Sequence, residues 1–190
     1  VSIKAAHQFN CKCYGIDAIP EFISYAQSKA SEYNVGHLCS FEIGDIREKI
    51  NELKVYDVII LGATGPVFGD YYTTLSALSK HPNDSGIIII DDGYIEDNSD
   101  YVHPLMLKKQ DLLHQISSAG MKLIEDDRFR GSSINESDDY IFKKLKNRCI
   151  ELIDKHPDKK DLFDNYIKKQ EIENYVLENK VVCTILVIKK

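Results

Sequence analysis

Two acidic residues each follow a short apolar run, an arrangement that can bind a nucleoside. Asp17 follows the run from Cys13 to Ile16, and Asp45 follows the run from Leu38 to Ile43. A carboxylate at the end of one strand can accept hydrogen bonds from both hydroxyls of a ribose. A second carboxylate, one strand over, can reach an adenine amino group. If the two runs are parallel strands, both acids lie at the same edge of a sheet, and the sequence predicts a nucleoside pocket there.

The segment between the two acids has the pattern needed to place the strands in parallel. Pro20 begins a stretch in which Phe22, Ile23, Ala26 and Ala30 recur at helical spacing. Proline is tolerated in a first helical turn, because its missing N–H would have no partner there. Strand, helix and strand on this scale form a parallel crossover unit, which predicts a doubly wound α/β sheet.

Two further strand ends carry candidate site residues. Gly62 to Pro66 interrupts the β-rich run from Tyr56 to Leu61, and small residues there would let a cofactor contact the backbone of Leu61 and Gly62. The alternative is a plain strand-to-helix turn, where glycine and proline are common. No Gly-Lys-Ser/Thr follows, so the turn does not match a phosphate-binding loop.

The isoleucine run from 87 to 90 predicts a fully buried central strand, and polar side chains follow it. Asp92 and Tyr94 are candidates for the acceptor side of the pocket. Alternatively, Asp91 and Asp92 cap a turn while Tyr94 packs on the next loop. Among the six histidines, His103 alone follows these acids by one loop, which makes it a candidate base.

Four segments together resemble the motifs of class I S-adenosylmethionine-dependent methyltransferases. They are GIDAIPEFISYAQ from Gly15, FEIGDI from Phe41, YDVIILGATGPVFGD from Tyr56 and GIIIIDDGY from Gly86. The resemblance covers residues 1 to 128 and the final strand. It implies S-adenosylmethionine as cofactor, and it implies cofactor contacts at the following positions: Asp17, Ala18, Asp45, Ile46, Leu61 and Gly62. Ile46 would give its backbone N–H to a ring nitrogen of the adenine.

The family's glycine-rich loop and the strand before it are absent from the sequence. Ser2 to Phe9 is similar to the helix that normally follows that loop. We therefore expect an N-terminally incomplete methyltransferase-like domain over residues 1–190, preceded by residues not included here. The missing first strand would be central in the sheet.

The C-terminal third predicts an insertion before the last strand. Helical patterns over 140–156 and 162–177 precede a strong strand over 181–188, which in this family runs antiparallel between its neighbours. Residues 131–179 would then form a helical insertion, serving as a lid over the acceptor or as the surface of a homodimer.

Spacing and turn signals also set the remaining expected boundaries. They predict helices over 46–53, over 67–80 and from His103-Pro104 onward, a strand over 121–126 and a polar loop over 131–139. Gly120 is expected to stop the preceding helix in a left-handed conformation.

Composition narrows the classes of partner. A net charge of −6 disfavours nucleic acid, and apolar runs such as Ile87 to Ile90 are far too short to cross a membrane. The five dispersed cysteines have no second pair at metal-ligand spacing, so no metal site is expected. Thiols of this kind suit a reducing cytosol, which predicts a cytoplasmic protein.

The function expected is transfer of a methyl group from S-adenosylmethionine to an unidentified acceptor, a small molecule rather than a macromolecule. A NAD-dependent oxidoreductase is the main alternative, since an acid after its second strand also binds a ribose. A third possibility is a non-catalytic nucleotide-binding or assembly module on the same fold. The direction of the last strand separates the first two, because dinucleotide folds continue with parallel crossovers.

Overall fold

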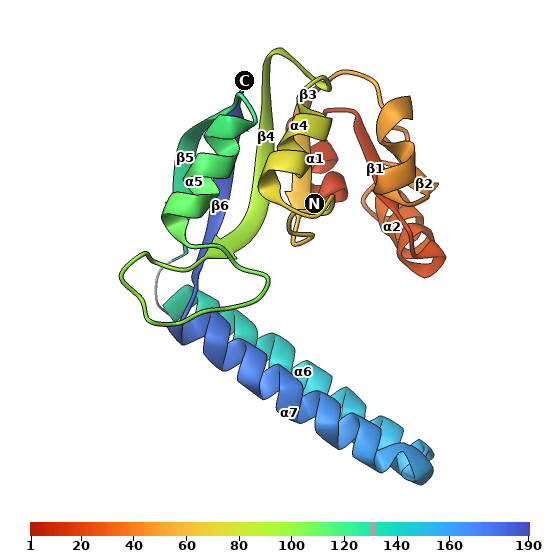
Figure 1. Cartoon of the computed structure of the whole chain (residues 1–190). Helices are drawn as coiled ribbons and strands as arrows, with labels where there is room; N and C mark the ends of the chain where they lie inside the picture. The colour runs from red at the N-terminus through yellow and green to blue at the C-terminus, as the bar shows by residue number, and fades with distance from the viewer. Residues whose placement is uncertain (130–131) are drawn as a thin grey trace.

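The computed structural model describes residues 1–129 and 132–190, and the side chains of 132–137 are left undescribed. Six strands alternate with helices in an α/β arrangement (Figure 1). The helices are α1 (Ser2–Phe9), α2 (Pro20–Glu32), α3 (Ile46–Lys49), α4 (Tyr71–Leu78), α5 (Lys109–Ser118), α6 (Ser132–Lys155) and α7 (Lys160–Asn179), with short 3-10 turns at Ile50–Glu52 and Pro157–Lys159. The strands are β1 (Cys13–Asp17), β2 (Cys39–Ile43), β3 (Tyr56–Gly62), β4 (Pro82–Tyr94), β5 (Lys122–Arg128) and β6 (Val182–Lys189).

A four-stranded sheet with the order β3-β4-β6-β5 forms the larger half of the molecule. β3 and β4 pair in parallel, whereas β6 is antiparallel to both β4 and β5. This confirms the predicted antiparallel last strand between its two neighbours. The alternative of a dinucleotide fold with only parallel crossovers does not have this topology.

The main core lies between this sheet and the two helices α4 and α5, which cover one of its faces (Figure 1). Ile88 and Ile90 of β4 are 1% and 0% exposed on that face. Ile87 and Ile89 point to the other face and are only half-buried. Val58 and Ile60 of the neighbouring strand β3 are exposed. The predicted full burial of the isoleucine run is therefore wrong for alternate residues, because α4 and α5 both pack on the face that Ile88 and Ile90 share.

β1, α2 and β2 form the predicted parallel crossover as a separate two-stranded sheet. Its small core contains Ala6 of α1, Ala30 of α2 and Val35, with Phe41 of β2 packed against them. Ile23 of α2 is also buried. The pairing of Asp17 with Ile43 brings the ends of both strands together, as the spacing predicted.

A gap separates the two sheets. Within the described residues no strand pairs with the facing edges of β1 and β3, and a cavity of about 830 Å³ lies along them. The rings of Tyr14 and Tyr56 stack across it, with centroids 6.5 Å apart. The described strands thus form two separate sheets, one of two strands and one of four.

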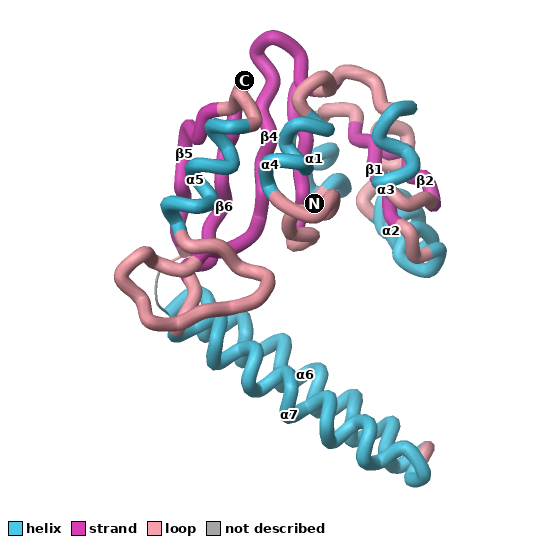
Figure 2. The backbone as a smooth tube through the Cα atoms, in the orientation of Figure 1, coloured by secondary structure: helices cyan, strands magenta, loops and turns pink. Residues whose placement is uncertain are grey.

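α6 and α7 form a long antiparallel hairpin that extends away from the strand ends (Figure 2). Cys149 of α6 is buried, and the Nζ of Lys146 on α6 lies 3.6 Å from Oε1 of Glu171 on α7. Among the described residues, no helix is both long and apolar enough to cross a bilayer.

Several predicted boundaries are wrong. β4 continues through Asp91 and Asp92 to Tyr94, so these acids belong to a strand paired with β6 and do not cap a turn. His103-Pro104 begins no helix, since α5 starts at Lys109, and α4 starts four residues later than predicted, after its Asp70 cap. Of the predicted loop over 131–139, Gly131 lies outside the described residues, and the rest is already helix α6. Gly120 does take a left-handed conformation, with φ of 71°.

Candidate active site

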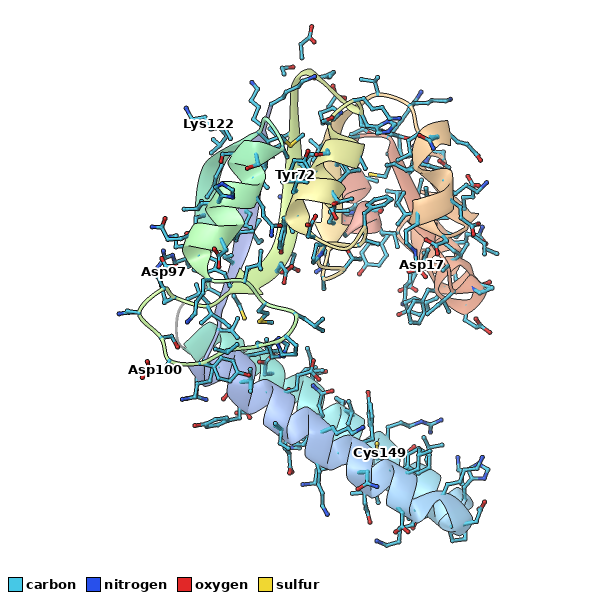
Figure 3. All side chains as sticks on the ribbon, viewed as in Figure 1. Asp17, Tyr72, Asp97, Asp100, Lys122 and Cys149 are labelled. Carbon is cyan, nitrogen blue, oxygen red and sulfur yellow. The ribbon has the colours of Figure 1, made fainter. Side chains whose placement is uncertain are left out.

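The carboxyl ends of β1, β3 and β4 lie at the edge of the molecule nearer the helical hairpin (Figure 1). Asp17 is at this edge, as Figure 3 shows. Its Oδ1 accepts a hydrogen bond of 2.8 Å from the backbone N–H of Ile19, which fixes the side chain at the start of α2. Within the described part of the chain, Oδ2 has no hydrogen-bond partner. One oxygen of a fixed carboxylate is thus available to a hydroxyl donor, and Ala18 beside it is exposed.

Asp45 caps α3 and binds Arg47. Its Oδ1 accepts the backbone N–H and the Nε of Arg47, each at 2.9 Å. Hydrogen bonds from the guanidinium and then the backbone of Arg47 lower the pKa of Asp45 to about 2. The Arg47 side chain is 65% exposed, so it can turn outward when another donor takes its place. Ile46, the first residue of α3, is half-buried next to this carboxylate.

The end of β3 offers backbone rather than side chains. The side chain of Leu61 packs in the core at 9% exposed, and Gly62 is exposed. A Cβ atom added at Gly62 would meet no atom within 4 Å, so there is open space beside this backbone. The following turn passes through Ala63 and Gly65 in left-handed conformations, with φ of 53° and 58°.

Asp92 is held by a buried tyrosine. The hydroxyl of Tyr71, the first residue of α4, donates to Asp92 Oδ2, and the backbone N–H of Gly93 donates to Oδ1 at 2.8 Å. Tyr71 is 3% exposed. Burial, followed by the nearby Asp92 charge, raises the pKa of Tyr71 beyond its usual range, so the hydroxyl stays protonated as a donor.

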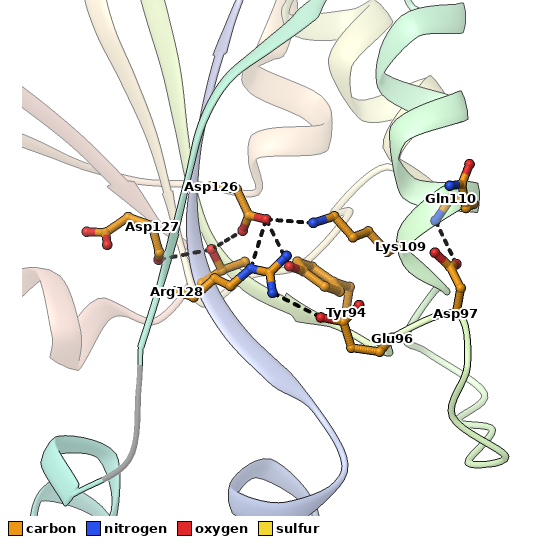
Figure 4. A network of polar contacts seen from close by, with 9 residues as sticks. Tyr94, Glu96, Asp97, Lys109, Gln110, Asp126, Asp127 and Arg128 are labelled. Carbon is orange, nitrogen blue, oxygen red and sulfur yellow. Dashed lines mark hydrogen bonds and ion pairs between the residues drawn. The ribbon is translucent and has the colours of Figure 1, made fainter.

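Tyr94 lies elsewhere, in the polar network of Figure 4. Its ring is 1% exposed, and its hydroxyl donates to Asp126 Oδ2 at 2.9 Å. The cations of Lys109 and Arg128 lie 5.2 and 5.6 Å from the ring centroid. Burial and the bond to Asp126 raise the pKa of Tyr94. Tyr94 therefore does not join Asp92 in an acceptor pocket. The two side chains leave the same face of β4, but the Tyr94 hydroxyl reaches Asp126 of β5, whereas Asp92 bonds Tyr71 of α4.

A loop over residues 95–108 takes the place of the helix predicted from His103. The Nζ of Lys108 holds it together by donating to the carbonyl oxygens of Glu96 at 3.3 Å, Tyr101 at 3.1 Å and Ser99. His103 Nδ1 accepts the backbone N–H of Leu105 at 3.2 Å. Nδ1 is thus an acceptor, which leaves Nε2 to carry the ring proton.

These segments enclose a cavity of about 770 Å³. One wall is the turn after β3 with Asp92 and Tyr71, and a second is the loop from Tyr101 to Leu107. The third wall is a stripe of α7 at helical spacing, consisting of Lys169, Ile172, Glu173, Val176 and Leu177. The structure brings Asp92 and His103 together at this cavity, whereas Tyr94 is not part of its lining.

A family model described as a methyltransferase domain matches residues 1–180. The chain belongs to this methyltransferase family. The resemblance to class I S-adenosylmethionine-dependent methyltransferases drawn from the sequence is thereby confirmed, and the domain is that of an enzyme. A comparison with curated proteins found no significant match.

Solved structures show the same fold as this methyltransferase domain. An S-adenosylmethionine-dependent methyltransferase from Geobacter sulfurreducens, in complex with S-adenosyl-L-homocysteine, has a TM-score of 0.80 at 17% identity, over 98% of this chain and 78% of that one. One from Thiobacillus denitrificans, in complex with the same ligand, has a TM-score of 0.79 at 17% identity, over 98% and 79%. An E. coli protein has a TM-score of 0.76 at 15% identity, over 98% and 79%.

Two features of the methyltransferase domain's cavity escaped sequence reasoning. Tyr71 lies in the helix predicted over 67–80, but nothing local in the sequence indicates its partner, because Asp92 lies 21 residues away. The α7 stripe did carry a signal in its helical spacing. That spacing defines an apolar face without saying whether the core, a ligand or another subunit covers it.

Proposed function

We propose that this methyltransferase transfers the methyl group of S-adenosylmethionine to a small molecule bound in the 770 Å³ cavity. The observation that carries the proposal is the position of this cavity. It adjoins the ends of β3 and β4, at the edge where Asp17 also lies (Figure 3). Open α/β sheets bind their ligands at this edge.

The residues present fit the adenosine part of the cofactor. Asp17 has one oxygen available for ribose hydroxyls, and the open space beside Gly62 allows a ligand to approach the backbone. Asp45 can accept the adenine amino group after Arg47 turns away. When bound, the cofactor supplies a methyl group on a sulfonium that is already a good leaving group.

The chain's own residues then have three tasks. Asp17 and Asp45 bind and orient the adenosine part, while the cavity walls position the acceptor and exclude water. Asp92 lines the cavity and can take a proton from an acceptor that must lose one. His103 lines it too, and it can do so once its Nδ1 releases the backbone N–H of Leu105. For an acceptor that needs no deprotonation, orientation alone is the protein's contribution.

Calorimetric titration with S-adenosylhomocysteine tests the cofactor assignment. Asp17→Ala should weaken binding by about 1.5–3 kcal/mol, the loss expected for hydrogen bonds to a charged group. Glu21→Ala, which removes an exposed acid on the adjoining first turn of α2, is the matched control and should bind normally. Equal affinity of the Asp17→Ala variant and the original protein would show that the ribose lies elsewhere.

The adenine assignment has a separate test. Asp45→Ala should reduce discrimination between the adenosine and inosine forms of the ligand, because the amino group is then no longer recognised. If the variant discriminates as well as the original protein, Asp45 does not contact the base.

A further inference from the structure

The chemical character of the 770 Å³ cavity narrows the class of acceptor. Its loop and helix walls present apolar side chains to the interior, among them Leu105, Met106, Ile172 and Val176. Leu105 is 80% exposed and Ile172 is 65% exposed, so these side chains have apolar surface still available for a ligand. Covering apolar surface of this kind with the apolar part of a ligand lowers the free energy, because both surfaces leave water.

Asp92 presents a fixed carboxylate to the same interior. Tyr71 and the backbone of Gly93 each donate one hydrogen bond to a different oxygen, so the carboxylate cannot rotate freely. Each carboxylate oxygen can accept two hydrogen bonds. One acceptor position therefore remains on each oxygen. Gly65 lies close by, since a Cβ atom there would be 3.6 Å from Asp92 Oδ2.

Negatively charged side chains outnumber positively charged ones around the cavity. Among the residues that the structure describes, its lining contains the carboxylates of Asp70, Asp92 and Glu173 and the ammonium of Lys169. Asp70 is already engaged, because its Oδ1 accepts the backbone N–H of Thr73 at 2.7 Å. A negatively charged ligand group would meet repulsion at Asp92, whereas a cation would be attracted. An apolar small molecule that carries an ammonium group would therefore complement both the apolar side chains of the loop and α7 and the Asp92 carboxylate.

We propose that the cavity takes an apolar small molecule that carries a protonated amine, with Asp92 binding the amine and α7 covering the apolar body. Tyr71 is a positioning residue that keeps the Asp92 carboxylate in place. This inference rests on the proposed function only in naming the ligand as the acceptor; the binding itself needs no cofactor.

The test uses two fluorescent probes that share an apolar body. Monodansylcadaverine ends in a protonated amine, and N-pentyl dansylamide lacks that amine. Titrated into the protein without cofactor, the amine probe should bind about tenfold more tightly, the scale of one charge-assisted hydrogen bond. Asp92→Asn should abolish this preference and leave the affinity for the neutral probe unchanged.

Three further variants separate the roles. Tyr71→Phe should reduce the amine preference without altering the neutral probe, whereas a merely structural role would change both affinities alike. Ile172→Ala should weaken both probes equally. Asp100→Asn, an exposed acid on the loop that is not part of the lining, should behave as the original protein does.

The results that overturn the inference are definite. Equal binding of the two probes, binding of neither, or an amine preference that survives Asp92→Asn would each exclude an amine site at Asp92. Normal binding of S-adenosylhomocysteine alongside such a result would leave the proposed methyl transfer intact. Conversely, an amine preference in a protein that does not bind the cofactor product would retain the site and remove the proposed function.

Discussion

Asp126 joins β5 to β4, β6 and α5 through four side-chain donors (Figure 4). It accepts hydrogen bonds from Thr184 at 2.8 Å, Tyr94 at 2.9 Å, Lys109 at 3.1 Å and Arg128 at 3.2 Å. Its side chain is 16% exposed. Burial alone would raise the pKa of Asp126, but the four donors outweigh it and lower the value to about 2. The network therefore favours the ionised carboxylate.

This network should make stability depend on pH. Because the pKa is lower in the folded protein than in the unfolded chain, Asp126 stabilises the fold above about pH 4 and loses that contribution as the pH falls toward 2. A shift of this size corresponds to about 2 kcal/mol at neutral pH. Urea unfolding of Asp126→Asn should show a loss of about that size at pH 7 and a smaller one at pH 3. The exposed Asp84→Asn variant is the control, and a pH-independent difference would contradict the role.

A second prediction at the residue scale compares two glycines. A Cβ atom at Gly93 would lie 2.7 Å from Val181 Cγ1 and 3.1 Å from the carbonyl oxygen of Val182, whereas one at Gly62 would meet nothing within 4 Å. Gly93→Ala should therefore cost about 1–3 kcal/mol through overpacking. Thermal unfolding should show Gly93→Ala melting several degrees lower and Gly62→Ala close to the original protein. Equal melting temperatures would show that β6 shifts easily away from β4.

At the scale of elements, one lysine supplies several of the hydrogen bonds that hold the loop over 95–108. Lys108 donates to three carbonyl oxygens of this loop, which forms a wall of the cavity. Lys108→Met should leave global stability within about 1–2 kcal/mol, since the carbonyls it bonds are only half-buried and can bond water instead. Amide hydrogen exchange in residues 96–107 should become faster. Lys122→Met, an exposed lysine at the start of β5, is the control. Unchanged exchange in the loop would show that other contacts hold it.

Elements set by local chemistry were the ones that sequence could predict. Pro20 and the apolar spacing located α2, the isoleucine run located β4, and Val182–Lys189 is a strand almost as predicted. The loop held by Lys108 could not be predicted, because its hydrogen bonds go to backbone atoms up to twelve residues away. The His103-Pro104 pair resembled a helix start, yet a bridge between His103 and Met106 replaces it.

For the candidate site, the sequence predicted which residues lie at the strand ends, but not the contacts that build the walls of the cavity. Asp17 and Asp45 follow apolar runs in the sequence, so their place at one edge follows from a parallel crossover. The separation of Asp92 from Tyr94 could not be predicted, because it depends on the distant partner of each side chain, Tyr71 for Asp92 and Asp126 for Tyr94. The contact between Tyr71 and Asp92 depends on how α4 packs against the sheet, which periodicity does not specify.

At the scale of the whole molecule, the α6–α7 hairpin remains a predicted lid. Replacing residues 131–179 by a short turn should leave S-adenosylhomocysteine binding nearly intact, since the candidate cofactor residues lie outside this segment. Methyl transfer should be lost, because the deletion removes one wall of the cavity. Calorimetry and a methyl-transfer assay on the same variant measure the two effects. Turnover retained at the original rate would rule out the lid.

The same hairpin is also the predicted dimer surface. Its outward apolar side chains include Ile141 at 58%, Ile150 at 48% and Leu162 at 61% exposed. Pairing such a stripe with its copy across a two-fold axis would bury it. Sedimentation velocity should then show a dimer that becomes a monomer when Leu162 is replaced by Lys. Lys143→Ala, a polar change on α6, is the control, and a monomer at all concentrations would exclude the dimer.

The order of the strands has a consequence for the protein while it is being synthesised. Among the strands that the structure describes, β6 comes last along the chain, and it lies between β4 and β5 and pairs with both. Until Val182–Lys189 has left the ribosome, the edges of β4 and β5 that pair with β6 have no partner strand. The α6–α7 hairpin can already fold at that stage, because its contacts are local. Open apolar edges invite pairing with other nascent chains. A nascent chain that stalls before β6 should therefore need chaperones more than the finished protein does.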